Sequence, residues 1–343
     1  MSNALTALLS PFVTGQLTLP PSARAFLLRA ESGIGLTDTW RDALVCEQAF
    51  KPSFDQLRGD GFQVERELSG DGFDVGLCLL SKHKAETLAN LGRAWRMLRP
   101  GGLLVCAGAA DIGAGSITRA LAATGVAMGS LSKAHCKVFW TRRTADTPAA
   151  LTAWAEAGRL QWLTELGIYS RPGLYNWDSI DAGSALLAER WPAAVGGRVA
   201  DLGAGWGYLS ARLLETGHPV TTLDLFEADG RALEAAQANL SRQESTTARI
   251  GYHWHDVAAG LPNAAYDWVV MNPPFHQGKA TDIDLGRAFI AAAAGALVPG
   301  GRMVMVANRQ LPYEPVLQAS FAGWRTLIET TTYKVIEAWR RPA

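Results

Sequence analysis

Four consecutive residues, Asn272 to Phe275, combine side chains that could direct chemistry at an amine. An exocyclic amine on a base is a poor nucleophile because its lone pair is delocalised into the π-system. If the Asn272 side-chain oxygen and the Pro273 carbonyl accept its two N–H groups, the nitrogen becomes more tetrahedral and its lone pair points at an electrophile. Pro274 keeps Pro273 out of helical geometry and so directs that carbonyl, while Phe275 offers a flat face to the base. We therefore predict a catalytic site at Asn272, Pro273, Pro274 and Phe275.

His276, the next residue, extends this hypothesis, because its imidazole could contact the base or backbone of a substrate. A structural hydrogen bond is an equal alternative for it. The run as a whole also has a simpler explanation, since two successive prolines end a strand in a turn whatever the function. The segments that precede the run decide between the two explanations.

A glycine-rich segment precedes it: residues 199–210, VADLGAGWGYLS, place Gly203, Gly205 and Gly207 at alternate positions between an apolar strand and a helix. Glycines there permit a tight turn and the close approach of a ligand to the backbone. The pattern is not the G-x-G-x-x-G of dinucleotide-binding proteins and is weak alone. Asp201 makes it more specific, because a carboxylate at the strand end attracts a cationic amino-acid group and repels a pyrophosphate.

Further acids follow the neighbouring predicted strands. Asp224 comes about 20 residues after the glycines, where a carboxylate can accept both hydroxyl protons of a ribose. Asp256 follows the next strand and could accept from the amine of a purine, while Asp181 and Gly183 could line the methionine end of the same ligand. Together these groups suit a nucleoside with a zwitterionic tail, and S-adenosylmethionine fits best. Taken alone, each acid could instead be a solvated carboxylate or a helix cap.

The elements that must position these residues alternate along the second half of the chain. We expect strands at residues 197–203, 220–225, 249–255, 266–272 and 301–308, helices at 206–215 and 227–241, and a closing hairpin at 324–339. Such alternation predicts an α/β fold with a mostly parallel, doubly wound sheet, whose ligands lie beyond the carboxyl ends of the strands.

An internal similarity indicates a second copy of this fold. The pattern Leu-x-Pro-Gly-Gly occurs at residues 98–102 and again at 297–301, and each copy follows an aromatic-Asp strand and a helix with Leu-Gly-Arg. So long a period fits two copies of one α/β domain, although chance similarity between α/β segments is the alternative. We expect one domain at 1–145, a linker at 146–164 and a second domain at 165–343.

Composition narrows the class of protein. With 48% hydrophobic and 19% charged residues the chain is globular, and its formal net charge of zero argues against binding free nucleic acid by bulk electrostatics. No signal peptide or long apolar run is evident, so we expect a cytoplasmic protein without a membrane segment. The four cysteines, Cys46, Cys78, Cys106 and Cys136, lack metal-site spacing, and we expect buried thiols and no metal.

The motifs DLGAGWG, MNPPFHQG, LVPGGRMVMVANRQLPY and YKVIEA resemble those of the ribosomal RNA guanine-N2 methyltransferases, above all the group that acts on 16S rRNA. The resemblance covers residues 165–340. It implies two tandem Rossmann-like class I methyltransferase domains, of which the first is degenerate. It further implies transfer of a methyl group from S-adenosylmethionine to the exocyclic N2 of a guanine in 16S rRNA, within the 30S particle. We also expect a monomer.

The resemblance implies Asp201, Gly203, Asp224 and Asp256 as cofactor contacts, and Asn272, Pro273 and Phe275 as the methyl-transfer site. The expected cofactor contacts are Asp181, Gly183, Asp201, Gly203, Ala204, Gly205, Gly207, Asp224, Leu225, Asp256, Val257 and Asn272. The expected substrate contacts are Phe275, His276 and Asn308.

The first copy departs from a working site. LLSKHKAE, residues 79–86, stands where the second copy has MNPPFHQGK, and residues 39–57 upstream hold no glycine. We therefore expect the first domain to bind no cofactor and to support folding or RNA positioning. Candidate phosphate contacts, which could equally form a solvated helix face, are Lys82, Lys84, Arg93, Arg96 and Arg99.

Two other functions remain open at this point. The related enzymes that methylate guanine N2 in 23S rRNA share N-P-P-F-H and the tandem plan, although ANRQLPYEP favours the 16S group. A non-catalytic ribosome-assembly factor with the same fold is the other alternative, against which the intact run from Asn272 to Phe275 argues.

Overall fold

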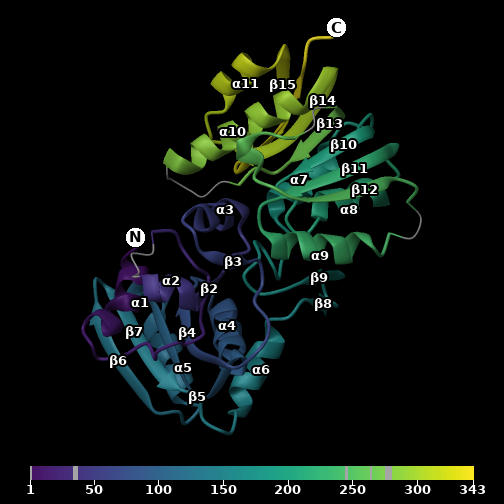
Figure 1. Cartoon of the computed structure of the whole chain (residues 1–343). Helices are drawn as coiled ribbons and strands as arrows, with labels where there is room; N and C mark the ends of the chain where they lie inside the picture. Colours follow the sequence, from purple (N-terminus) through teal and green to yellow (C-terminus); the bar gives the residue numbers. More distant parts are fainter. Residues whose placement is uncertain (1, 34–37, 244–245, 263–264, 275–279) are drawn as a thin grey trace. The chain divides into compact units, whose positions relative to one another are not determined.

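The structure, a computed structural model, describes residues 2–33, 38–243, 246–262, 265–274 and 280–343. The chain divides into two compact units (Figure 1). The first comprises Met1–Leu160 with Arg171–Gly173, and the second comprises Gln161–Ser170 with Leu174–Ala343. Each unit is an α/β sandwich in which helices cover both faces of a seven-stranded sheet.

The C-terminal unit contains a sheet of strand order β12-β11-β10-β13-β14-β16-β15. Its strands are β10 (Gly197–Leu202), β11 (Val220–Glu227), β12 (Arg249–Trp254), β13 (Tyr266–Met271), β14 (Leu297–Asn308), β15 (Gly323–Glu329) and β16 (Tyr333–Trp339). The first five strands in the sheet order are parallel, and β16 pairs antiparallel with β14 and β15. The carboxyl ends of the five parallel strands therefore meet at one edge.

Helices bury both faces of this sheet. One face is covered by α7 (Ala182–Arg190), α8 (Tyr208–Glu215) and α9 (Gly230–Leu240), and the other by η2 (Val257–Ala259), α10 (Ala280–Ala296) and α11 (Glu314–Ser320). The central strands β10 and β13 are consequently almost wholly apolar, as expected for parallel strands buried on both faces. Asp201 in β10 is the one charged residue of the two strands that is completely buried, because Arg198 and Asp267, near the strand starts, are not buried.

The N-terminal unit has the same strand order, β3-β2-β1-β4-β5-β7-β6. Its strands are β1 (Ala25–Leu28), β2 (Leu44–Glu47), β3 (Gln63–Glu65), β4 (Phe73–Leu79), β5 (Leu98–Ala109), β6 (Met128–Lys133) and β7 (Cys136–Arg142). Its helices are α1 (Asn3–Val13), α2 (Asp38–Ala43), α3 (Lys51–Gly59), α4 (Lys84–Met97), η1 (Ala110–Ile112), α5 (Ala114–Ala122) and α6 (Ala149–Ala157). The predicted fold class, two mostly parallel doubly wound sheets, is confirmed.

The predicted boundaries differ from the observed ones for local reasons. Helix α8 begins two residues later than expected because Gly207, at φ 88°, is its left-handed N-cap. Helix α9 begins at Gly230 because the Asp229 side chain caps it. Residues 146–164, expected to be a linker, contain α6 and β8 (Gln161–Leu163), which pairs with β9 (Ile168–Ser170). Gly92 lets α4 approach the α6 backbone so closely that a Cβ would not fit.

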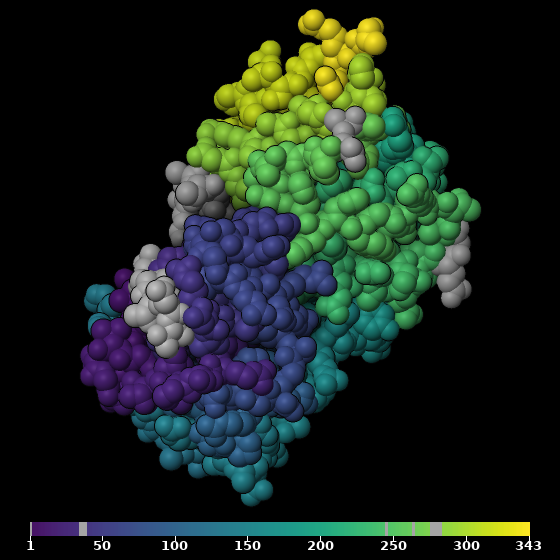
Figure 2. Space-filling model, in the orientation of Figure 1, coloured from purple at the N-terminus to yellow at the C-terminus, as the bar shows by residue number. Residues whose placement is uncertain are grey.

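Buried side chains fill the space between the helices and each sheet, and Figure 2 shows the outer face of the molecule in the orientation of Figure 1. The four cysteines are buried free thiols, as predicted. Within the described ranges no helix is long and apolar enough to cross a membrane. No cluster of His, Cys, Asp and Glu suited to a metal ion occurs among the described residues.

Candidate active site

A cavity of about 70 Å³ lies at the carboxyl edge of the C-terminal sheet, where the glycine loop after β10 meets the end of β13 and the start of α7. It is lined by Tyr175, Asn176, Asp181, Ser184, Gly203, Ala204, Gly205, Trp206, Tyr208, Leu209 and Asn272. The structure thus brings together the predicted residues Asp181, Gly203, Ala204, Gly205 and Asn272.

Asn272 directly follows β13, and its amide is held in one orientation. Its Nδ2 donates to Asp181 Oδ1 and to Ser184 Oγ, both at 2.8 Å. Because only the amide nitrogen carries hydrogens to donate, these two acceptors fix which end is which. The Oδ1 atom is buried and has no hydrogen-bond partner in the described part of the chain. It is therefore available to accept a hydrogen bond from a ligand.

Asp181 has two structural tasks at once. It is the N-cap of α7, where its Oδ1 accepts from the Ser184 backbone N–H at 2.7 Å, so the helix-cap explanation is correct. Its Oδ2 accepts from the Tyr175 hydroxyl at 3.1 Å and from Asn176 Nδ2 at 3.3 Å. The cap is thus also the group that orients Asn272. Gly183 is buried in the first turn of the same helix and does not line the cavity.

The three glycines of the loop differ in what they provide. Gly205, at φ 57°, has open space where a Cβ would be, so its missing side chain leaves room beside the backbone for a ligand. Gly203, at φ 71°, lies close to Phe289 of α10. Gly207 does not line the cavity. A Cβ at this position would collide with Leu240 of α9, so glycine lets the loop pack closely against that helix. Its role is helix packing.

Asp201 lies beneath this loop and is fully buried. Its Oδ2 accepts from the Ser210 hydroxyl at 2.7 Å, while Oδ1 has no partner in the structure as described. Burial raises the pKa of Asp201 to about 7, although the hydrogen bonds from Ser210 oppose the rise. An unpaired acceptor of this kind is suited to a cationic ligand group, which would lower its pKa again.

Asp224 is not at the strand end, because β11 continues for three residues beyond it to Glu227. Its carboxylate instead contacts His253 Nε2 at 3.0 Å and the Tyr266 hydroxyl at 2.9 Å. Glu227 occupies the position expected of Asp224, since its Oε2 accepts from the Gly205 N–H at 2.7 Å. Burial raises the pKa of Glu227 to about 7. The sequence analysis missed Glu227; counting from the helix cap Asp229 backwards would have found it.

The other predicted contacts lie outside the cavity. Asp256 caps η2 through the Ala258 N–H, and Val257 and Leu225 are buried in the core. Asn308 ends β14, where its Oδ1 accepts from the Gln310 N–H at 3.4 Å. Among the remaining predicted site residues, Pro273 is buried and Pro274 is exposed. Phe275 and His276 lie outside the described residues.

These groups fit S-adenosylmethionine. The space at Gly205 admits a ligand to the loop backbone, Glu227 offers a carboxylate beside it, and the unpaired Asp201 oxygen is an acceptor. The same groups disfavour a pyrophosphate, which both carboxylates would repel.

The chain is similar to known methyltransferases. The family model for the methyltransferase small domain matches residues 165–337. Ribosomal RNA small subunit methyltransferase C of Psychromonas ingrahamii is 30% identical over 81% of this chain and 77% of its own. The same enzyme of Pseudomonas aeruginosa is 33% identical over 70% of this chain and 72% of its own. The solved structure of T. thermophilus 16S rRNA N2 methyltransferase RsmC, in complex with AdoMet and guanosine, has a TM-score of 0.81 at 26% identity, covering 99% and 92% of the two chains.

The fold and the site define the chain as a class I, S-adenosylmethionine-dependent methyltransferase. More narrowly, it belongs to the ribosomal RNA small subunit methyltransferase C family.

The buried Asp201 predicts a pH-dependent stability of the ligand-free protein. Because its folded pKa is raised to about 7, the wild type loses stability as pH rises from about 4 to 7, whereas Asp201→Asn does not titrate. At pH 8 we expect the free energy of unfolding of the variant to exceed that of the wild type by up to roughly 4 kcal/mol, at about 1.4 kcal/mol per pKa unit. Near pH 4 we expect no difference between the two. Urea unfolding across this pH range measures it.

Asp267→Asn is the matched control, because hydrogen bonds from Arg198 outweigh desolvation and lower the pKa of Asp267. This variant should lose stability at neutral pH. Equal pH profiles for Asp201→Asn and the wild type would contradict the assignment.

Proposed function

We propose that this chain transfers a methyl group from S-adenosylmethionine to the exocyclic N2 of a guanine in 16S rRNA, and that it acts on the 30S particle in the cytoplasm. The observation that carries the proposal is the buried, unpartnered Oδ1 of Asn272, fixed by the two bonds to its Nδ2. The names of the relatives support the substrate, since the T. thermophilus structure is described as a 16S rRNA N2 methyltransferase that holds AdoMet and guanosine.

The cofactor would lie against the glycine loop. Glu227 would accept the ribose hydroxyls, and Asp201 would provide an acceptor for the amino group of the methionine moiety. Once bound, S-adenosylmethionine supplies an electrophilic methyl group on a positively charged sulfur. The Asp181 carboxylate adds negative charge to the same cavity, which favours a cationic ligand.

The substrate amine would be activated by two oxygens. Asn272 Oδ1 and the Pro273 carbonyl would accept the two N–H groups of guanine N2, which reduces delocalisation of the lone pair into the ring. The nitrogen then forms its bond to the methyl carbon as the carbon–sulfur bond breaks, and the surplus N2 proton is lost to water. Phe275 remains the expected stacking partner of the base. Since a paired guanine exposes neither its lone pair nor its face, the base must leave its helix.

The N-terminal unit is proposed to bind no cofactor and to support folding or position the RNA. Sheet register places Leu27 where β10 has Asp201, and Leu79 where the second copy has Asn272. The segment equivalent to the glycine loop is the one after β1, where Arg29 takes the position of Gly203, and not residues 39–57, which contain β2 and most of α3. An apolar residue in place of each polar group supports the loss of that site.

Three of the candidate phosphate contacts in this unit are already engaged in ion pairs. Arg93 is held by Glu47 at 2.6 Å, and Arg99 pairs with Asp74 at 2.6 Å. Arg96 pairs with Glu156. These pairs favour the structural alternative for the arginines and leave Lys82 and Lys84 as the stronger candidates for RNA contact.

Asn272→Ala tests the catalytic role. Loss of a preorganised acceptor should lower kcat by roughly 100- to 1000-fold, while the affinity for S-adenosylmethionine changes by less than about tenfold, because Asp181 keeps its cap and its bonds to Tyr175 and Asn176. Turnover with labelled cofactor and calorimetry measure the two effects. Gln318→Ala, an exposed amide on α11, is the control. Unaltered turnover in Asn272→Ala would refute the role.

Asp181→Ser tests the orienting of the amide. Serine is as good an N-cap as aspartate, so α7 should remain stable, yet the shorter side chain cannot reach Asn272. We expect kcat to fall roughly tenfold or more, with a similar fall in Ser184→Ala. In an Asn272→Ala background both substitutions should have almost no further effect on kcat, because nothing remains to be oriented. Additive losses would show a general structural role instead.

The proposed substrate is tested by incubating the protein with unmodified 30S and 50S particles and labelled cofactor, then mapping the modified nucleotide. We expect one N2-methylguanine in the 16S rRNA of the 30S particle. Label in 23S rRNA would transfer the proposal to the large subunit, and label in neither particle would reject it.

A further inference from the structure

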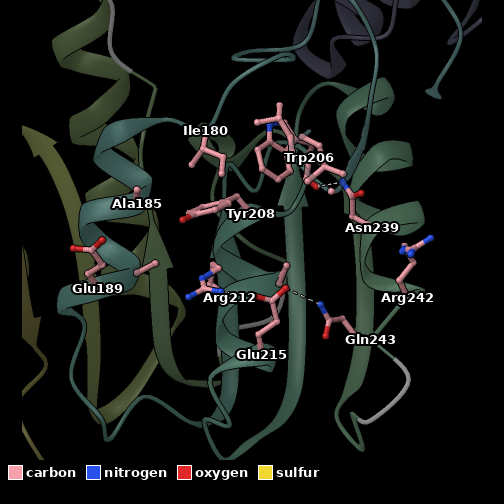
Figure 3. A pocket seen from close by; sticks show the side chains of 15 residues that line it. Ile180, Ala185, Glu189, Trp206, Tyr208, Arg212, Glu215, Asn239, Arg242 and Gln243 are labelled. Atoms are coloured by element: carbon pink, nitrogen blue, oxygen red, sulfur yellow. Dashed lines mark hydrogen bonds and ion pairs between the residues drawn. The ribbon is translucent and has the colours of Figure 1, made fainter. Parts of the chain in front are cut away.

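A second and larger cavity, of about 500 Å³, lies within the C-terminal unit over α7, α8 and α9 (Figure 3). Its volume is in the range of sites that hold small organic ligands. Trp206 and Tyr208 line both this cavity and the small one beside Asn272. The two cavities are therefore neighbours that share these two lining residues.

The lining changes character along the cavity. Ile180, Trp206 and Tyr208 gather at one end, and the hydrogen-bonding side chains of Glu189, Arg212, Glu215 and Gln243 lie further along the helices (Figure 3). Flat apolar surface combined with donors and acceptors suits a nucleobase, which offers a face for stacking and a polar edge. In the described structure Glu189 has no cationic partner, and a carboxylate of this kind can accept from a base amine.

Arg242 provides positive charge in the same cavity. Its guanidinium lies over the Trp162 ring, 4.2 Å from the centroid, which holds the group by a cation–π contact. Arg212 is paired with Glu215 at 2.5 Å, whereas Arg242 has no carboxylate partner within the ranges described. A stacked arginine with free N–H groups is suited to a phosphate.

Hydrogen bonds of Asn239 fix the backbone beside Trp206, which lines both cavities. Asn239 of α9 accepts from the Tyr169 N–H at 2.6 Å and donates to the Tyr169 carbonyl at 3.0 Å and to the Trp206 carbonyl at 2.9 Å. These bonds tie the β8–β9 hairpin to the glycine loop. A ligand therefore enters a preformed site and does not have to order the loop.

The exposed apolar side chains of the C-terminal unit lie beside the two cavities. Its large hydrophobic residues that are described as exposed are Trp162, Tyr175 and Ile180, at 37%, 60% and 42% exposure. Tyr175 lines the small cavity, Ile180 lines the large one, and Trp162 carries Arg242. Exposed apolar groups that gather beside one site mark an interaction surface. Aromatic side chains combined with arginine are typical of protein surfaces that bind single-stranded RNA.

We propose that the larger cavity binds a nucleotide that neighbours the target guanine in the same RNA strand, with its base against Trp206 and Tyr208 and its phosphate at Arg242. This inference rests on the proposed function and deepens it. The enzyme would hold the unstacked target by a second nucleotide, so part of the recognition of the strand lies in the catalytic unit itself.

Two substitutions test the proposal by different means. Arg242→Glu reverses the charge that receives the phosphate, and Ala211→Trp fills the cavity from α8. In methylation of unmodified 30S particles, each should raise KM for the particle about tenfold or more, while the affinity for S-adenosylmethionine and kcat at saturation stay within about twofold of wild type. The matched controls are Arg190→Glu on α7 and Gln237→Trp on α9, both exposed and outside the cavity. Thermal unfolding verifies that each variant is folded.

A photoreactive amino acid at Ala188, on the cavity wall, identifies the occupant. Cross-linking to a nucleotide within a few positions of the methylated guanine supports the proposal. Cross-linking to a ribosomal protein, or only to a remote nucleotide, overturns it. An unchanged KM in both variants, with active wild type, rejects the second site alone, whereas a wild type inactive on rRNA rejects the proposed function and this inference together.

Discussion

The two hydrogen bonds that Asn272 Nδ2 donates, to Asp181 and Ser184, are the constraint on which the site depends. An amide has a donor end and an acceptor end of nearly equal shape, and only one orientation presents oxygen to an amine. The acceptors come from the start of α7 and the amide from the end of β13, so the proposed chemistry requires that helix and strand pack in one register. Leu187 of α7, whose side chain is buried in the core, is part of that packing.

The same helix end joins the capping of α7 to the orientation of the Asn272 amide. An N-cap leaves a carboxylate oxygen with spare acceptor capacity after it has bound the backbone N–H. Asp181 uses that capacity for Asn272 and its second oxygen for Tyr175 and Asn176. The cap therefore stabilises the helix and, through it, the direction of the amide.

The sequence alone was sufficient for prediction where a residue type is tied to one backbone geometry or to one position in a strand. The glycine loop, the Asn272 run and the alternating elements predicted the fold and several residues that the structure places around one cavity, because they rest on backbone geometry and strand ends. Asp224 was chosen instead of Glu227 because the choice required the length of β11, and a strand end is uncertain by a few residues from sequence. The larger cavity could not be predicted. It is formed by outward faces of three helices and by a hairpin that begins in the segment expected to be a linker.

In the N-terminal unit the chain turns after β1 as it does after β10, although the residues of the turn differ. Arg29 occupies the position of Gly203 and still has a positive φ, 57° against 71°, although a residue with a side chain pays about 1–2 kcal/mol for that conformation. The bend at the end of the first strand is held by the hydrogen bond from the Ala30 N–H to the Glu47 carbonyl of the neighbouring strand. The turn is thus a property of the strand arrangement that both units share, so the proposed absence of a cofactor site in the first unit would leave the form of that unit unchanged.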